Sequence, residues 1–559
     1  MRCERIALRR AVAAAFVFLS VCARGGAAPA PLPLPVAGPT TPQEMEAFVD
    51  GFMGAQTPGA IAGATVAVVK DGALFFTKGY GYADIAKQIP VNPARTIFRL
   101  GSISKLFTWT AVMQLVEQHK LDLDADVNTY LQEFKIPATH GAPVPLRNIM
   151  THTFREPLPA DLAGEASGAY VMRQGMLERQ PFEMIHNWAP AGSGSSVATD
   201  VAKFMLAYLQ EGGTGGGRIL RPETVRLMFT RALSPDPALD GLLLGFYETR
   251  INSRRVIGHG GDTLYFHSVI GLLLEAHLGL YVSINTGGQS ALMPYALERA
   301  FFQHYFPAKL PQVRPPADAV SRNERYAGTY RTLRHSYTKF EKILSAFGDI
   351  HAVPMSDGTL AMGDPVFHTP ARWVEVGDGV FRKIDEDVFI AFKGNDGGPS
   401  TGIVGPFPPI AAERIQWYES GAFLLFMVGS SSLLFITVMI SAVRHRRLDR
   451  AAPSSLRWAR AVLACGGMLL LVFHIGLALV LGAGFEQLAS ALPASLYVVL
   501  GLPLLALPLI AGAVLFTVRL WVSAAWSLGA RVHYTLAVFA AVALLVVLNY
   551  WNLVGYHLG

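Results

Sequence analysis

The chain has 559 residues, of which 51% are hydrophobic and 16% charged, and its formal net charge is +6. This length is too great for one hydrophobic core, so we expect two or more domains. The arginines gather at the N-terminus and beside apolar C-terminal segments, and there is no basic stripe with interleaved aromatic residues. The charge therefore indicates membrane topology, and nucleic acid is not an expected partner.

Residues 1–28 have the three-part pattern of a secretory signal peptide. A basic start precedes the apolar run Ala11–Val21, which is too short to span a bilayer, and small residues follow at Gly25–Ala28. A leader that remains as an uncleaved anchor is one alternative. Lipidation is another, because Leu19–Cys22 loosely matches a lipoprotein box. Residues 29–42 form a proline-rich linker.

A globular domain is expected over residues 43–308. Two apolar runs, Ala64–Lys70 and Ala73–Tyr80, flank Asp71-Gly72, which is a strong hairpin signal. Helical periodicity follows from Ser102 to Gln118, with Ser102 at an N-cap or first-turn position.

The second half of this domain has helical patterns and then strand patterns. Helices are expected over Val197–Leu209, Pro222–Thr230 and Ser290–Tyr305. Strands are expected over Leu243–Arg250, Arg255–Gly258, Leu264–Leu274 and Gly279–Asn285. Strands at both ends of the domain, with helices between, predict one antiparallel sheet assembled from both ends.

Residues 309–410 differ in character. A linker at Pro311–Pro316 is followed by short alternating runs punctuated by glycine, which predicts a small all-β module. Its function cannot be inferred from sequence.

Residues 421–559 contain four apolar segments, each long enough to cross a membrane. They lie at about 422–443, 461–482, 494–518 and 534–555. Arginines occupy the first and third connecting loops, which the positive-inside rule assigns to the cytoplasm. We therefore expect a multi-pass protein of the cell (inner) membrane, with everything before Gly421 on the periplasmic or extracellular side. Transport is a lesser alternative, because the intramembrane residue His474 has no acidic partner in the sequence.

The sharpest local motif is Ser102-Ile103-Ser104-Lys105. Residues three apart share one face of a helix, so the Lys105 amine can reach the Ser102 hydroxyl. A lysine shielded from water has a lowered pKa, and its neutral form can accept the serine proton. The pattern alone is weak, since it recurs at Ser336–Lys339. A helix cap beside a solvated lysine is the alternative.

The context of this motif resembles a known family. Phe98–Thr108 is similar to the nucleophile segment of class C β-lactamase-like serine hydrolases, a group that includes penicillin-binding proteins, esterases and D-peptidases. The resemblance runs from about Thr41 to Pro307 in family order. It continues through Leu121–Val127, Leu146–Thr153, Pro190–Gly192, Thr199–Phe204 and Gly258–Thr263. It implies an α+β domain in which helices pack on an antiparallel sheet.

The resemblance also implies roles for particular residues. Ser102 would be the acylated nucleophile and Lys105 its proton-transfer partner. The implied substrate-binding and oxyanion residues are His259, Gly260, Gly261 and Asp262. His259 would bind a substrate carboxylate or hydrogen-bond into the site, and the backbone N–H groups of Ser102 and Asp262 would form an oxyanion hole. A strand followed by a turn is the alternative interpretation of His259-Gly260-Gly261.

The sequence departs from the family in one place. Relatives have a Tyr-x-Asn or Ser-x-Asn motif that shares proton transfer with the lysine, and none occurs between Lys105 and His259. A contiguous piece is missing near residue 153, where the chain passes directly into Phe154–Pro159. Tyr170 could substitute for the tyrosine of the missing motif, but no motif in the sequence around it supports this role. Loss of one proton-transfer group lowers turnover by roughly two to four orders of magnitude.

These features predict a membrane-anchored serine hydrolase that acts on an amide or ester of a small molecule or peptide, including β-lactams, through an acyl-enzyme. The alternative is a weakened relative that binds a cell-wall peptide-like ligand as a sensor or scaffold. No cofactor or metal is implied, because the histidines lack ligand spacing and Glu211–Gly217 lacks the Lys-Ser or Lys-Thr of a phosphate loop. The expected partners are the substrate and the lipid bilayer. The oligomeric state is not predicted.

Overall fold

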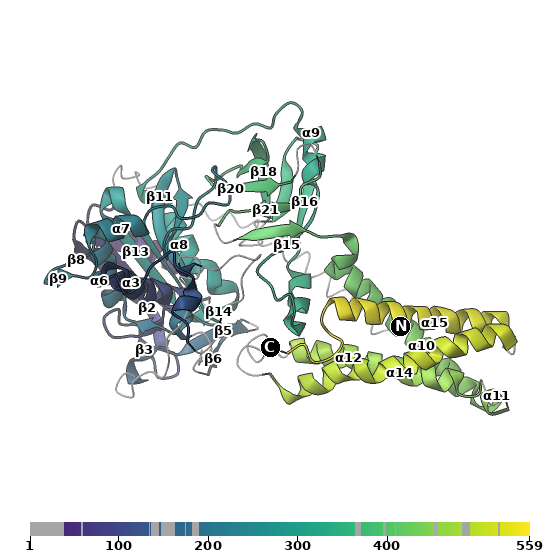
Figure 1. Ribbon diagram of the computed structural model, residues 1–559. Coiled ribbons are helices and arrows are strands. Elements are labelled where there is room, and N and C mark those ends of the chain that lie inside the picture. Colours follow the sequence, from purple (N-terminus) through teal and green to yellow (C-terminus); the bar gives the residue numbers. More distant parts are fainter. Residues whose placement is uncertain are drawn as a thin grey trace.

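The computed structural model shows three parts in chain order: an α+β domain, a β-barrel and a bundle of long helices (Figure 1). It describes residues 38–558 apart from 57–59, 133–134, 136–144, 147–162, 174, 182–188, 364–369, 395–397, 408–409, 452, 454–455, 483–491 and 524–525. The expected signal peptide, most of the proline-rich linker and the break near residue 153 lie outside the described residues.

A seven-stranded sheet organises the α+β domain, in the order β10-β11-β12-β13-β1-β2-β3. Near its centre, β1 (Gly63–Lys70) pairs antiparallel with β13 (Leu278–Ile284), which confirms a sheet assembled from both ends of the domain. The other strands are β2 (Ala73–Asp84), β3 (Ile89–Pro90), β10 (Tyr247–Ile251), β11 (Arg254–Asp262) and β12 (His267–Leu273). Asp71 and Gly72 both have positive φ, as the tight turn between β1 and β2 requires.

Helices cover both faces of this sheet. On one face, α2 (Pro42–Gln56) and α8 (Met293–Tyr305) pack against residues that include Val66 and Val68. On the other, Ala67 and Val69 contact the helices α3 (Ser104–Glu117), α6 (Ala198–Leu209) and α7 (Pro222–Met228). Successive side chains of a strand point to opposite faces, so a strand covered on both sides is continuously apolar, as β1 is.

Small strand pairs border the main sheet. They are β4 (Phe98–Arg99) with β7 (Ser195–Ser196), β5 (Ala169–Arg173) with β6 (Met176–Gln180) and β14 (Thr286–Gly287), and β8 (Gly213–Thr214) with β9 (Gly217–Arg218). The last pair lies at the glycine-rich run Glu211–Gly217 and ends one residue beyond it, at Arg218. The expected strand from Leu243 begins only at Tyr247, because residues 243–246 form a turn in which Gly245 has φ +86°.

The β module is a closed barrel of eight strands. They are β15 (Gly328–Thr332), β16 (Ile350–Pro354), β17 (Leu360–Gly363), β18 (Pro370–Gly377), β19 (Val380–Lys383), β20 (Phe389–Lys393), β21 (Gly402–Val404) and β22 (Ala411–Arg414). Its core contains Tyr330, Trp373 and Phe381, all fully buried. The last strand lies just beyond the boundary at residue 410 that the sequence indicated.

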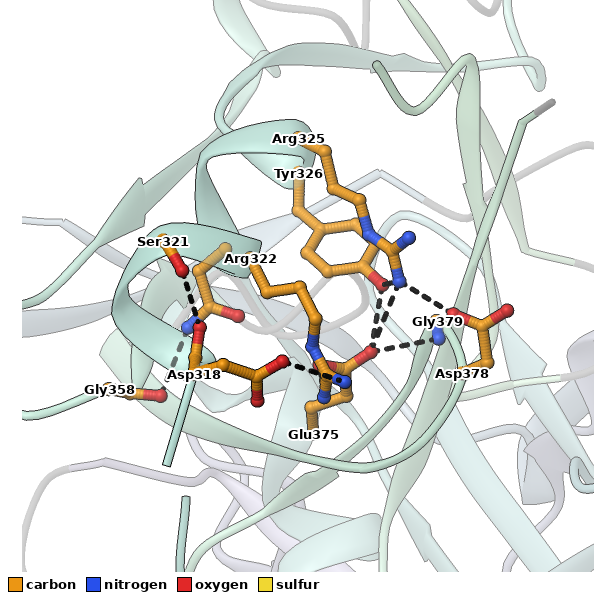
Figure 2. Close-up of polar contacts among 10 residues, drawn as sticks. Asp318, Ser321, Arg322, Arg325, Tyr326, Gly358, Glu375, Asp378 and Gly379 are labelled. Carbon is orange, nitrogen blue, oxygen red and sulfur yellow. Dashed lines mark hydrogen bonds and ion pairs between the residues drawn. The ribbon is translucent and has the colours of Figure 1, made fainter. Parts of the chain in front are cut away.

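A buried carboxylate fixes the short helical segment before the barrel, α9 (Ala319–Arg322) and its 3-10 continuation. Glu375 on β18 accepts bonds from Arg322 at 2.6 Å and from the Tyr326 hydroxyl at 2.8 Å (Figure 2). Arg325 bonds to Asp378 at 2.6 Å in the same cluster. With both Glu375 oxygens bonded, the cluster has the paired and hydrogen-bonded form that a buried charge requires.

Four long apolar helices form the C-terminal bundle. They are α10 (Gly421–Arg444), α12 (Ala459–Gly482), α14 (Ala494–Ser523) and α15 (Leu528–Tyr550), with the short α11 (Arg446–Ala451) after the first. Each has 23 to 30 residues and a mean hydropathy of 2.1 to 2.5, sufficient to cross a bilayer. The chain is therefore a multi-pass membrane protein. The last helix begins a few residues earlier than expected, because Ser527 caps its start, and it ends a few residues earlier, at Tyr550.

The barrel is joined to one end of this bundle by a 3-10 segment, η9 (Phe340–Phe347). Its residues Phe340, Ile343 and Ala346 belong to the same buried cluster as residues of the four helices. Beside it, Arg331 forms a two-bond ion pair with Asp349, both bonds 2.9 Å, and its guanidinium lies 4.9 Å from the Trp551 ring. The barrel thus contacts the bundle through an apolar joint with a buried ion pair.

Candidate active site

The structure brings Ser102 and Lys105 into direct contact. Ser102 lies in the 3-10 turn η2 (Gly101–Ile103) that leads into α3, and Lys105 follows one turn later. The Lys105 Nζ atom donates to the Ser102 hydroxyl at 2.5 Å and to the Ala191 carbonyl at 3.0 Å. The hydroxyl and the amine therefore have the geometry of a nucleophile and its base.

The environment of Lys105 favours its neutral form. Burial, and to a smaller extent the positive charge of Arg334, lower the pKa of the Lys105 amine to about 8. Neither hydrogen-bond partner of the amine carries a negative charge that would hold it protonated.

The turn that carries Ser102 is pressed against the sheet. Gly101 has φ +54°, and a Cβ atom there would lie 2.6 Å from the backbone nitrogen of Asp262 at the end of β11. From β12, the Ser268 hydroxyl donates to the Leu100 carbonyl at 2.9 Å. These contacts hold the backbones of Ser102 and Asp262 near each other.

Ser104, the inner serine of the motif, has a structural role that sequence reasoning missed. Its hydroxyl donates to the Gly101 carbonyl at 2.6 Å and accepts from the Gly194 backbone N–H at 2.9 Å. It thereby links the nucleophile turn to the segment that supplies the Ala191 carbonyl.

The residues His259–Asp262 lie at the end of β11, directly beside this turn. A Cβ atom on Gly261 would collide with the Leu100 carbonyl, and one on Gly260 would lie 2.9 Å from Cζ of Tyr295. Both glycines are therefore required by close packing. Because side chains alternate along a strand, His259 shares the Gly261 side, which faces the nucleophile turn. Its ring lies 4.7 Å from that of Tyr247.

The Asp262 side chain is held by two neighbours. The Tyr295 hydroxyl on α8 donates to one carboxylate oxygen at 2.9 Å, and His267 Nδ1 lies 2.8 Å from the other. On the adjacent strand, the Tyr247 hydroxyl accepts a bond from the Gly260 N–H. Burial raises the pKa of Tyr247 well above its usual value, so this hydroxyl stays protonated. Sequence reasoning singled out none of these three side chains.

Comparison with known proteins finds a family model that matches the part of the chain around this turn. Residues 45–161, which include the Ser102 turn, match the family model described as Beta-lactamase. This part of the chain is thus similar to β-lactamase and penicillin-binding-protein-like proteins.

Curated proteins are similar to this chain over short stretches. Protein flp of Staphylococcus aureus (strain MRSA252) is 31% identical over 110 residues, which are 20% of this chain and 21% of that protein. Teichoic acid D-alanine hydrolase of Staphylococcus aureus is 39% identical over 88 residues, 16% of this chain and 21% of that protein. The chain thus matches about a fifth of the length of these relatives.

Solved structures of similar proteins cover more of the chain at lower identity. The octameric penicillin-binding protein homologue from Pyrococcus abyssi has 17% identity and a TM-score of 0.40, covering 66% of this chain and 99% of that one. SurE has 18% identity and a TM-score of 0.45, covering 67% of this chain and 98% of that one.

Tyr170 does not take the place of the family's missing tyrosine within the described residues. Its hydroxyl accepts the Ile85 backbone N–H at 2.8 Å, its side chain is buried, and no described contact joins it to Ser102 or Lys105. The described residues also contain no group of three or more His, Cys, Asp or Glu placed to hold a metal ion.

Proposed function

We propose that this protein is a membrane-anchored serine hydrolase that cleaves an amide or ester through an acyl-enzyme on Ser102. The observation that carries the proposal is the 2.5 Å contact between Ser102 and a lysine whose pKa is lowered to about 8. At pH 7 about one lysine in ten is then neutral, against about one in three thousand at an ordinary pKa.

The reaction follows from this geometry. Neutral Lys105 takes the Ser102 proton as the hydroxyl oxygen attacks the substrate carbonyl carbon. The backbone N–H groups of Ser102 and Asp262 donate to the resulting oxyanion. Protonated Lys105 then gives its proton to the leaving nitrogen or oxygen, and the C–N or C–O bond breaks. Water, deprotonated by Lys105, cleaves the acyl-enzyme, which releases the acid and restores Ser102.

The substrate and the side of the membrane are also proposals. A relative named as a teichoic acid D-alanine hydrolase supports testing a D-alanyl ester beside peptide and β-lactam substrates. The arginine-rich first and third loops of the bundle support a cytoplasmic location for those loops, which puts the Ser102 site outside the cell membrane.

A second candidate function is ligand binding without useful turnover. It is favoured by the absence of a Tyr-x-Asn or Ser-x-Asn triplet between Lys105 and His259. Without that hydroxyl, turnover is expected to be about two to four orders of magnitude below that of a complete site.

Acylation of the full-length protein in detergent separates the two candidates. Intact-protein mass spectrometry after exposure to a fluorophosphonate or a penicillin should show one adduct, absent in Ser102→Ala. Lys105→Met should slow its formation by roughly two to four orders of magnitude. Lys203→Met, which removes an exposed lysine on α6, is the matched control and should label normally. An adduct retained in Ser102→Ala, or no adduct on the folded wild type, would reject the hydrolase.

A further inference from the structure

Asp262 combines two features that conflict in the proposed reaction. Its backbone N–H is one of the two proposed oxyanion donors, and its side chain carries a negative charge beside that donor. Aspartate side chains readily accept hydrogen bonds from nearby backbone N–H groups. A carboxylate close to the forming oxyanion would also repel it. The reaction therefore requires that the Asp262 carboxylate be held away from its own N–H.

The hydrogen bonds at the end of β11 show which way the Asp262 N–H points. In an antiparallel strand, the N–H groups of alternate residues point to the same side. The Thr263 N–H donates to the Phe266 carbonyl at 2.8 Å, in the turn that leads to β12. The Gly260 N–H instead donates to the Tyr247 hydroxyl on β10. The Asp262 N–H consequently points away from β12, to the side on which β10 lies.

This side of Asp262 is not covered by β10 in the described pairing. The register of β10 with β11 reaches only to Gly258. Beyond it, the turn that contains Gly101 lies against the Asp262 backbone nitrogen, as the 2.6 Å approach of a Cβ at Gly101 shows. The nucleophile turn thus takes the place of a pairing strand, which is the position that an oxyanion donor needs.

The Asp262 side chain lies on the other face of the sheet, towards α8. It shares this face with Val256, which packs in the same cluster as α8. Tyr295 on α8 donates to one carboxylate oxygen at 2.9 Å, and His267 Nδ1 on β12 lies 2.8 Å from the other. Because an ionised carboxylate only accepts, Nδ1 carries the proton. Both oxygens are therefore engaged on the face opposite the nucleophile turn.

From these contacts we infer that Tyr295 and His267 are positioning residues of the oxyanion hole. Together they hold the Asp262 carboxylate on the α8 face and leave the Asp262 N–H free for the oxyanion. This inference rests on the proposed function. Both side chains act through Asp262, from elements that lie behind and beside the third-motif strand.

Acylation kinetics of the full-length protein in detergent test the inference. Tyr295→Phe should lower the maximal rate of Ser102 acylation by a penicillin or a D-alanyl ester by about 10- to 100-fold, less than the roughly 100- to 1000-fold loss that follows removal of an oxyanion donor. The half-saturating concentration should change little, because the oxyanion forms only in the transition state. Tyr80→Phe is the matched control. Its hydroxyl on β2 also donates to a carboxylate at 2.9 Å, that of Asp50 on α2, and its loss should leave the rate unchanged.

A double-mutant cycle separates positioning from a purely structural role of Tyr295. Asp262→Ala keeps the backbone N–H and removes the carboxylate, so adding Tyr295→Phe to it should slow acylation no further. Equal slowing by Tyr295→Phe in the parent protein and in Asp262→Ala, or no slowing in the parent, would overturn the inference.

His267 provides a second test that does not depend on the folding of Asp262→Ala. His267→Asn keeps an N–H donor near the position of Nδ1 and should retain most of the rate, whereas His267→Leu removes the donor and should slow acylation as Tyr295→Phe does. The Nε2 atom is buried and has no hydrogen-bond partner in the described part of the chain, so leucine breaks no bond there. Equal acylation rates of these two variants would also overturn the inference. A wild-type protein that is not acylated would reject the hydrolase itself, an outcome distinct from an acylated protein whose rate these substitutions leave unchanged.

Discussion

The amine of Lys105 donates to two neutral oxygens, the Ser102 hydroxyl and the Ala191 carbonyl, at 2.5 and 3.0 Å. Carboxylate partners would stabilise the ammonium form and raise the pKa, whereas these neutral dipoles orient the amine with less stabilisation of its charged form. Ser102 and Lys105 are therefore positioned and partly shielded from water, and the protonation state of the Lys105 amine should control the rate of acylation.

The rate of Ser102 acylation is expected to rise with pH through about 8 and then level off. Only neutral Lys105 accepts the serine proton, and its pKa is lowered from 10.5 to about 8, so the neutral form dominates above that pH. Stopped-time mass spectrometry between pH 6 and 10 measures the profile. A rate that falls as pH rises from 7 to 9 would contradict the role of Lys105, and Lys105→Met should lose this dependence.

Gly101→Ala should impair both folding and acylation. The substitution places a Cβ in a left-handed backbone conformation and 2.6 Å from the Asp262 nitrogen, so the free energy of unfolding should fall by about 2 to 5 kcal/mol. Thermal unfolding and probe labelling report the two effects. Gly54→Ala, at a helix position with no atom near the added Cβ, is the control and should change neither. Equal thermal stability and equal labelling of the two variants would contradict the close packing of the Gly101 turn against Asp262.

Arg331→Met should destabilise the joint between barrel and bundle by about 3 to 5 kcal/mol, because it leaves the buried Asp349 carboxylate without its partner. Thermal unfolding in detergent measures the loss. Adding Asp349→Leu should recover part of it, since the unpaired charge is then removed. Arg372→Met breaks an exposed pair of the same barrel and should leave the melting temperature unchanged. A similar small effect of both single variants would show that the buried pair is unimportant.

Membrane orientation can be tested with single cysteines, after replacing the native ones by serine. Tyr418→Cys precedes the first span and Leu448→Cys lies in α11 after it, and both side chains are exposed. In intact cells stripped of any outer envelope, a membrane-impermeant maleimide should label position 418, and position 448 only after permeabilisation. The opposite pattern would place the Ser102 site in the cytoplasm.

Local patterns in the sequence predicted most of the elements but few of the contacts between them. The hairpin at Asp71 and the spacing of Ser102 and Lys105 are local signals, and the structure contains both the hairpin and the contact. Strand β11 was expected to end at Gly258, since glycines weaken a strand pattern. It continues to Asp262 because residues 259–262 pair with β12, and the close neighbours of Gly260 and Gly261 leave no room for larger side chains.

The barrel contribution to the site was beyond sequence reasoning. Phe407 belongs to a module whose function had no sequence signal, and it lies far along the chain from Tyr247, whose ring it contacts. Periodicity reports which face of an element is buried and not which distant segment covers it. Tyr295 on α8 was missed for the same reason, and His267 was missed because its place beside Asp262 depends on the pairing register of β11 and β12.

The packing of η9 against the helix bundle limits how far the barrel can move from the membrane-spanning helices. A hydrolase on a long flexible stalk sweeps a volume above the bilayer, but Phe340, Ile343 and Ala346 are packed among residues of the spanning helices. Under the proposed function, this packing would hold the Ser102 site at a nearly constant height over the lipid surface, and substrate bonds would have to come to it. Removing the bundle to obtain a water-soluble fragment would expose that apolar seam, so such a fragment should aggregate unless those three side chains are made polar.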